Sequence, residues 1–231
     1  MMCLDICPPS KATLKHHKKA VDVTSQWAKR CFNHMDNQDM KYGYKQILVP
    51  IIQGGTNEKL RLQSAESLME LNADIYAYGG LAVGEPIEEM LKTVNYLDGI
   101  VFNNKPRYLM GVGTPTDIIQ CIASGIDMFD CVLPTRSGRT GLAYTWEGKL
   151  NLRNSKYKKD DSPIDNNMNF RDLKSYSKSY INHLINTNEI LASMILTINN
   201  ISFYQELMKK IRETIKNNVF NEFYDKYIDV I

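Results

Sequence analysis

The first 133 residues alternate between short apolar runs and longer amphipathic segments, and this alternation constrains the fold more than any other feature. The apolar runs predict buried strands at residues 1–6, 46–52, 74–77, 107–112 and 126–133. Helical spacing of apolar residues predicts helices at residues 11–34, 60–71, 87–96 and 117–124. Thr114 and Pro115 supply an N-cap and a first helical residue for the last of them. Strands that alternate with helices in units of about thirty residues pair in parallel. The sequence therefore predicts an α/β fold with a parallel sheet.

Each predicted strand ends in glycine or in a polar residue, at Asp5, Gln53, Gly79–Gly80, Gly113 and Asp130. Glycines also end many strands for purely structural reasons. However, the carboxyl ends of parallel strands gather on one rim, where a (β/α)8 barrel builds its active site. A complete barrel takes about 250 residues and eight strands. We therefore expect an incomplete (β/α)8 fold of the TIM-barrel type, with about five βα strands present and three missing at the amino end.

Beyond Pro134 the pattern changes. Residues 143–153 predict a small β element with a turn at Glu147–Gly148, and residues 154–172 are polar and irregular. Helices are predicted at residues 173–196, 202–217 and 220–231. The expected domains are residues 1–142, part of the barrel, and residues 143–231, a β and helical C-terminal subdomain. One apolar stripe in this region is interpreted as core packing: Tyr176, Tyr180, Leu184, Ile190, Leu191, Met194 and Ile195.

The charge and cysteine content of the chain limit the classes of protein to which it can belong. The net charge of +2 by itself predicts no polyanion partner, but residues 136–159 carry seven Lys/Arg against Glu147 alone. That local excess indicates either a solvated face or a track for phosphates. The five cysteines include no Cys-x-x-Cys pair, and Cys3 and Cys7 with the His16–His17 pair match no standard zinc spacing. No apolar run approaches the roughly 20 residues that span a bilayer. We expect a cytoplasmic protein without a membrane partner.

The segment from Gly125 to Gly141 combines features that favour chemistry. Asp130 lies near the end of an apolar run that Pro134 closes, and Arg136 and Arg139 follow among glycines, which predicts a flexible cationic loop. Taken alone, Asp130 could equally be a strand-end cap or a salt-bridge partner. A carboxylate beside two arginines is a more specific combination.

Five ordered markers resemble the carboxyl-terminal part of the bacterial tRNA-guanine transglycosylases, with the best agreement over residues 53–153. They are Leu4-Asp5-Ile6-Cys7, Gln53-Gly54-Gly55, Gly79-Gly80-Leu81-Ala82-Val83-Gly84-Glu85, Arg107-Tyr108-Leu109-Met110-Gly111-Val112-Gly113 and the Asp130 segment. Members of that family are transferases of queuosine biosynthesis. They exchange guanine at the tRNA wobble position for a 7-deazaguanine precursor base.

The resemblance implies a role for each matching residue. Asp130 would be the nucleophile that attacks the ribose C1′, as the carboxylate of a retaining glycosidase does. The exchanged base would be bound by Asp5, Cys7, Gln53, Gly80 and Leu81, and Cys7 points to 7-aminomethyl-7-deazaguanine as the incoming base. The tRNA anticodon loop would be bound by Gly111, Val112, Gly113, Thr114, Pro115, Thr116, Asp117, Thr135, Arg136, Ser137, Gly138 and Arg139.

The sequence departs from the family pattern at two places. No residue matches the proton-handling aspartate, which lies on an earlier strand of the family barrel. The zinc site of the family uses three cysteines and a histidine. Residues 163–173 contain no cysteine, and Asn199 or Asn200 stands where the histidine is expected, so we predict no zinc and no other cofactor.

Two hypotheses follow from these departures. The chain is either an enzyme whose barrel is completed by an N-terminal portion elsewhere, or a non-catalytic or degenerate homologue that acts at most as an RNA-binding partner. By resemblance, a homodimer or an N-terminal complementing chain is the expected assembly.

Overall fold

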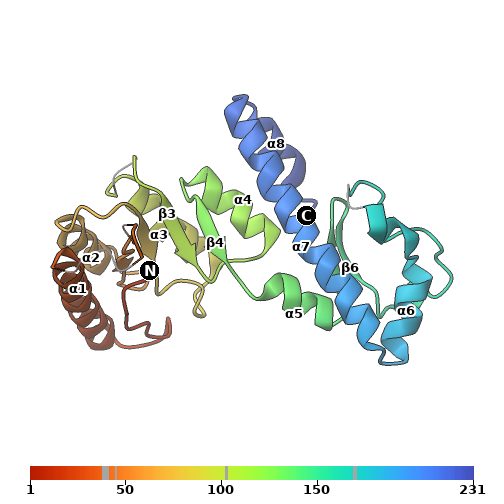
Figure 1. Cartoon of the computed structure of the whole chain (residues 1–231), viewed down its shortest axis with the longest axis horizontal. Helices are drawn as coiled ribbons and strands as arrows, with labels where there is room; N and C mark the ends of the chain where they lie inside the picture. Colours follow the sequence, from red (N-terminus) through yellow and green to blue (C-terminus); the bar gives the residue numbers. More distant parts are fainter. Residues whose placement is uncertain (38–41, 45, 102–103, 169–170) are drawn as a thin grey trace. The chain divides into compact units, whose positions relative to one another are not determined.

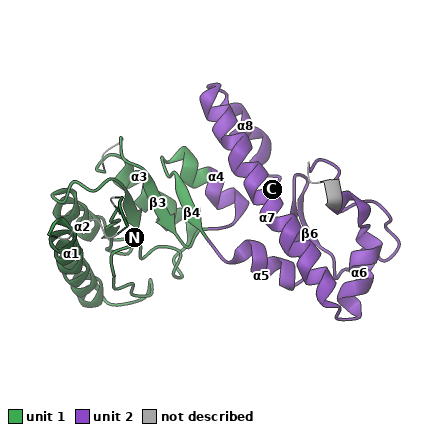
Figure 2. Ribbon diagram, in the orientation of Figure 1, with its two compact units in different colours: residues 1–112, 120–130 green, residues 113–119, 131–231 purple. Residues whose placement is uncertain are grey.

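The computed structural model of the chain describes residues 1–37, 42–44, 46–101, 104–168 and 171–231. The chain forms two compact units (Figure 2). Unit 1 comprises residues 1–112 and 120–130, and unit 2 comprises residues 113–119 and 131–231. Residues 169 and 170, within the expected irregular segment 154–172, lie outside the described residues.

Unit 1 is built on a parallel sheet with the strand order β1-β2-β3-β4 (Figure 1). Its strands are β1 (Ile51–Ile52), β2 (Tyr76–Tyr78), β3 (Arg107–Met110) and β4 (Met128–Asp130). The parallel α/β arrangement predicted from the alternation is confirmed. The strands are shorter than expected, and the predicted first strand is reduced to a single parallel bridge between Met2 and Val49.

Three helices of unit 1 follow the predicted amphipathic segments: α1 (Leu14–Asp36), α2 (Glu58–Met69) and α3 (Ile87–Asp98). Side-chain caps fix where two of them begin. The Thr13 hydroxyl accepts from the backbone N–H of His16, and the Asn57 side chain accepts from that of Leu60. The helices bury their apolar faces in a core that includes Ala28, Leu68 and Val94.

Helix α4 (Pro115–Ala123) begins as predicted. The hydroxyl of Thr114 accepts from the N–H of Asp117 at 3.2 Å, and Pro115 is the first helical residue. None of the described helices is long and apolar enough to cross a membrane.

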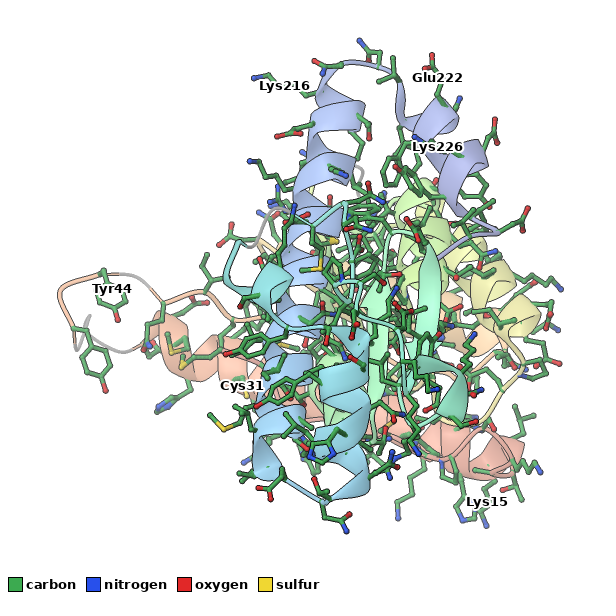
Figure 3. The ribbon with its side chains drawn as sticks, turned by 90° about the vertical axis from the view of Figure 1, so that its right-hand side faces the viewer. Lys15, Cys31, Tyr44, Lys216, Glu222 and Lys226 are labelled. Atoms are coloured by element: carbon green, nitrogen blue, oxygen red, sulfur yellow. The ribbon has the colours of Figure 1, made fainter. Side chains whose placement is uncertain are left out.

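Unit 2 contains one hairpin and a set of helices that pack around α7. Its elements are α5 (Leu133–Arg139), β5 (Leu142–Thr145), β6 (Gly148–Asn151), the 3-10 helices η1 (Ser155–Tyr157) and η2 (Arg171–Ser175), α6 (Lys178–Asn186), α7 (Ile190–Lys216) and α8 (Phe220–Tyr227). The predicted β element is confirmed as the β5–β6 hairpin. Helices α5, α6 and α8 and strand β5 all contact α7. In α8, Phe223 is buried, whereas Glu222 and Lys226 are exposed (Figure 3).

The predicted helix boundaries in unit 2 were wrong. The expected helix 173–196 is interrupted between α6 and α7, where Asn188 adopts a left-handed conformation with φ of 58°. The expected gap at residues 197–201 is instead continuous helix within α7. Asn199 and Asn200 occupy that stretch without breaking it, because both amides are buried and bond to neighbouring backbone.

The segment after Asp130 also differs from the prediction. β4 ends at Asp130, and Leu133–Arg139 forms helix α5, so Arg136 and Arg139 lie on a helix and not in a flexible loop. Pro134 fits the first turn of this helix. Gly138 is required inside the helix, because a Cβ there would lie 2.7 Å from the backbone nitrogen of Thr197 in α7.

The apolar stripe interpreted as core is only partly buried. Leu184 and Ile195 are buried, but Ile190 is 76% exposed and Met194 is 54% exposed. Helix α7 therefore presents an exposed apolar row, the α7 stripe, which consists of Ile190, Leu191, Met194, Ile198 and Ile201. Their spacing places all five on one face of the helix.

Candidate active site

The carboxyl edge of the unit 1 sheet carries a hydrogen-bonded pair formed by Asp5 and Gln53. Gln53 follows β1 directly, and its Nε2 donates to Oδ2 of Asp5 at 2.6 Å. The backbone N–H of Gln53 donates to Oγ of Ser64 in α2 at 3.0 Å, which anchors the strand end to the helix behind it. Gln53 is completely buried. A carboxylate and an amide from distant parts of the sequence are thus held together.

The other side-chain atom of Gln53 lacks a partner in the described part of the chain. Its Oε1 is buried and accepts no hydrogen bond there. A Cβ added to Gly80 would lie only 2.3 Å from this oxygen, so glycine is required for the close approach, and its φ of +64° also favours glycine. Buried acceptors are nearly always satisfied, and an orphan in a native fold indicates a missing donor such as a ligand N–H.

The loop that follows β2 is fixed by one carboxylate. Glu85 accepts from the backbone N–H groups of Ala82 and Val83, the latter at 3.0 Å. Leu81 is buried, and Cys7 lies within hydrogen-bond reach of the Gly80 backbone. Burial raises the pKa of the Cys7 thiol, while the Gly80 backbone opposes that rise through a hydrogen bond. The five residues expected to bind the base therefore form one cluster: Asp5, Cys7, Gln53, Gly80 and Leu81.

Arg61, which was not among the predicted site residues, holds the backbone of this cluster in place from helix α2. Its side chain is completely buried, and burial lowers its pKa to about 10. Nε donates to the Gly55 carbonyl at 2.6 Å, and the two Nη atoms donate to the carbonyls of Ile52 at 2.8 Å and Gly80 at 3.3 Å. One guanidinium thus fixes the backbone on both sides of Gln53 and at Gly80. The signal in the sequence was helical spacing, because Arg61 shares a face of α2 with Ala65.

Asp130 is the last residue of β4 and is exposed. Its Oδ1 accepts from the Tyr108 hydroxyl at 2.7 Å and from the Gly111 N–H at 3.2 Å, while Oδ2 accepts no hydrogen bond in the described part of unit 1. Burial raises the pKa of the Tyr108 hydroxyl to about 12, and its bond to Asp130 adds to the rise. Because Met110 pairs with Asp130 in the parallel register, these groups lie at the same edge of the sheet as Gln53.

The residues expected to bind RNA are distributed over both units, and several of them are held by hydrogen bonds within their own unit. Gly111 and Val112 follow β3 and belong to unit 1. In unit 2, the Gly113 carbonyl accepts from the Tyr204 hydroxyl, and the Thr116 hydroxyl donates to the Ile231 carbonyl at 2.6 Å.

On α5, Arg136 and Arg139 are exposed, whereas Ser137 and Gly138 are buried on the side that faces α7. The Thr135 hydroxyl donates to the Val132 carbonyl at 3.2 Å. On this helix the arginines form the accessible surface, and the small residues between them support it.

Asparagines occupy the place where the family pattern expects a zinc-binding histidine. In the described residues, no three His, Cys, Asp or Glu side chains gather in a way that could hold a metal. Asn200 instead joins three elements, since its amide donates to the Pro134 and Leu142 carbonyls and its oxygen accepts from the Tyr144 N–H. Asn199 donates to the Tyr144 carbonyl at 3.1 Å. Side-chain amides hold α7 against α5 and β5.

The parallel sheet and the groups at its carboxyl edge define an α/β protein, consistent with a TIM-barrel-like fold, with a nucleophile candidate and a cluster of polar groups at one sheet edge. Within that class, the chain belongs to the queuine tRNA-ribosyltransferase family, whose model matches residues 1–230. This finding confirms the resemblance to the tRNA-guanine transglycosylases.

The relatives support the same assignment. The chain is 44% identical over 229 residues to proteins named queuine tRNA-ribosyltransferase from Francisella tularensis subsp. tularensis (strain WY96-3418), subsp. holarctica (strain LVS) and subsp. novicida (strain U112). Each alignment covers 99% of this chain and 60% of the relative. The chain therefore spans about 60% of the length of the curated relatives it matches.

Proposed function

We propose that this chain carries the base-recognition cluster and the nucleophile of a tRNA-guanine transglycosylase. The reaction replaces the wobble guanine of tRNA with a 7-deazaguanine precursor of queuosine, through a covalent aspartyl–ribosyl intermediate. The observation that carries the proposal is the geometry of Asp130. One carboxylate oxygen is fixed by two donors, and the other is available at the sheet edge that holds the Asp5–Gln53 pair.

The recognition cluster matches the hydrogen-bonding edge of guanine. Guanine presents an N1–H and an exocyclic amine as neighbouring donors and O6 as an acceptor. The carboxylate of Asp5 supplies the acceptors for these donors, and the buried Gln53 amide holds that carboxylate in place. The backbone of Gly80 and Leu81 supplies N–H groups for O6, and glycine allows the base to approach closely. A 7-deazaguanine base has the same edge, so one cluster serves both the departing and the incoming base.

The chemistry proceeds by two displacements at C1′. In the first, Oδ2 of Asp130 forms a bond to C1′ while the C1′–N9 bond breaks and its electron pair leaves with guanine. In the second, the incoming base forms the new glycosidic bond and the electron pair of the C1′–Oδ2 bond returns to Asp130. The incoming base loses the proton on N9 and the departing guanine gains one on N9, so the exchange as a whole neither consumes nor releases a proton. Flipping the wobble nucleotide out of its stack gives Asp130 access to C1′.

The test of this proposal is to trap the covalent intermediate. The chain is incubated with a tRNA anticodon stem-loop that carries guanine at the wobble position, denatured, and examined for an RNA–protein adduct. The matched control is the same RNA with adenine at that position, which presents an acceptor where guanine presents N1–H. We expect an adduct with guanine alone. RNA binding without an adduct would contradict the proposal and favour the non-catalytic RNA-binding partner.

The arginines of α5 lead to a prediction about RNA binding. Replacing both Arg136 and Arg139 with glutamine should weaken binding of the anticodon stem-loop and flatten its salt dependence, because each phosphate contact releases counterions. Two lost contacts should reduce the slope of log K against log salt by about 1.5. Filter binding between 50 and 200 mM salt measures this slope. As a control, the double replacement of exposed Lys216 and Lys226 removes the same charge elsewhere in unit 2. If the two double replacements changed the slope equally, Arg136 and Arg139 would lie on an ordinary solvated face and would not contact phosphates specifically.

The α7 stripe supports the proposal that two copies of the chain associate. Five apolar side chains on one helical face form a contiguous exposed patch, and such patches mark interaction sites. Placing a charge within the patch by Met194→Glu should raise the dimer dissociation constant at least about tenfold, because the charge would lose its water on association. Sedimentation velocity measures this change. The control Ile215→Glu changes a similarly exposed side chain at the far end of α7. A dimer insensitive to Met194→Glu would exclude the stripe as its interface.

A further inference from the structure

The contact between Tyr108 and Asp130 distinguishes the two oxygens of the carboxylate. Both donors, the Tyr108 hydroxyl and the Gly111 N–H, act on Oδ1. They come from β3 and its carboxyl end, next to β4 in the sheet, so the sheet register fixes their positions. The charged groups at the opposite, amino end of these two strands have partners of their own, since the Asp127 carboxylate accepts from the Arg107 N–H at 2.9 Å and the Arg107 side chain bonds to Asp98.

We infer that Tyr108 is a positioning residue that stabilises Asp130 as a leaving carboxylate and thereby sets how long the covalent intermediate lasts. This inference rests on the proposed function. With Oδ1 bonded to two donors, Oδ2 is the atom that attacks C1′. In the intermediate, Oδ1 becomes the carbonyl oxygen of a neutral ester. When the incoming base displaces the ester, the returning electron pair restores a full carboxylate, which Tyr108 and Gly111 stabilise.

The energetic argument depends on the difference between a charged and a neutral acceptor. A hydrogen bond to an ionised carboxylate is roughly twice as strong as one between neutral groups. The Tyr108 hydroxyl therefore favours the free carboxylate over the ester. Removing the hydroxyl should shift the balance toward the intermediate and slow its breakdown. A tyrosine with a purely structural role would instead lower adduct formation and turnover together.

The experiment compares Tyr108→Phe with the wild-type chain in two assays. One assay measures the amount of denaturant-stable adduct at steady state, and the other measures incorporation of labelled guanine into tRNA. We expect Tyr108→Phe to hold more adduct and to exchange guanine about tenfold more slowly. Tyr96→Phe, which removes a hydroxyl from α3 in the same unit, serves as the control, and circular dichroism checks that both variants fold.

A spectroscopic measurement tests the same contact without requiring turnover. With tyrosine labelled at 13Cζ, the Tyr108 resonance is identified by its absence in Tyr108→Phe. This resonance should move when Asp130→Asn replaces the charged acceptor with a neutral amide. An unmoved resonance would overturn the inference, because the hydroxyl would then not donate to Asp130.

The outcomes separate this inference from the proposed function. If the wild-type chain forms no adduct and exchanges no guanine, the proposed function fails and the inference fails with it, even where the resonance moves. If the wild-type chain is active but Tyr108→Phe lowers adduct and exchange in proportion, or changes neither, the inference alone is overturned. More adduct with slower exchange supports both.

Discussion

Replacing Asp130 by asparagine is expected to abolish the covalent adduct with tRNA and to reduce guanine exchange by about 10³-fold or more. The amide has nearly the shape of the carboxylate, and its oxygen can still accept from Tyr108 and Gly111, so the sheet edge should keep its structure. The amide is a poor nucleophile, however, and carries no charge to stabilise an oxocarbenium-like C1′. Denaturing gel electrophoresis of the trapped complex measures the adduct, and labelled-guanine incorporation measures the exchange.

The matched control for this change is Asp74→Asn. Asp74 is exposed and precedes β2, at the opposite edge of the same sheet, so the same loss of charge occurs far from the proposed reaction centre. The control should form the adduct at the wild-type level. An adduct that persists in Asp130→Asn would show that Asp130 is not the nucleophile and would favour the alternative interpretation as a strand-end cap.

Replacing Arg61 by methionine is expected to lower the free energy of unfolding by about 3–5 kcal/mol. Methionine has a similar apolar stem but leaves the carbonyls of Gly55 and Gly80 without the donors that now satisfy them in a completely buried site. The Ile52 carbonyl keeps the bond from the Gly79 N–H, so two of the three carbonyls account for most of the cost. Urea unfolding followed by circular dichroism measures the change as a lower transition midpoint.

The control for this second change is Arg30→Met on the exposed face of α1, where we expect less than about 0.5 kcal/mol. Arg61→Lys adds a further comparison, since lysine keeps the charge but cannot place three donors in a planar fork. If Arg61→Lys were as stable as the wild type, the site would require only a buried positive charge. The hydrogen bonds to three carbonyls would then not be essential.

The sequence predicted those features of the fold that depend on local patterns. The parallel βα array followed from apolar runs at regular spacing, and the start of α4 followed from Thr114 and Pro115. The failures arose where tertiary contacts override local preference. Asn199 and Asn200 resemble a helix break in sequence, yet α7 continues through them because their amides satisfy the backbone of β5 and Pro134. The burial of Gly138 against Thr197 likewise turned an apparent loop into α5.

The site was predictable where a residue ends a strand or follows it directly, as Asp130 and Gln53 do. Tyr108 and Arg61 were missed for a different reason. The contact of Tyr108 with Asp130 depends on the register between β3 and β4, which short strands do not reveal. Helical spacing places Arg61 on the same face of α2 as Ala65, but only the folded chain shows the three carbonyls that accept its hydrogen bonds.

Helix α7 has a mechanical consequence for unit 2. A single helix of 27 residues spans roughly 40 Å. Met194 of the α7 stripe and Tyr204, whose hydroxyl bonds to the Gly113 carbonyl, lie ten residues apart on it, a separation of roughly 15 Å. Because α7 is continuous between them, the helix holds these two residues at a fixed separation. The α7 stripe and the residue that supports the Gly113 segment therefore belong to one continuous element.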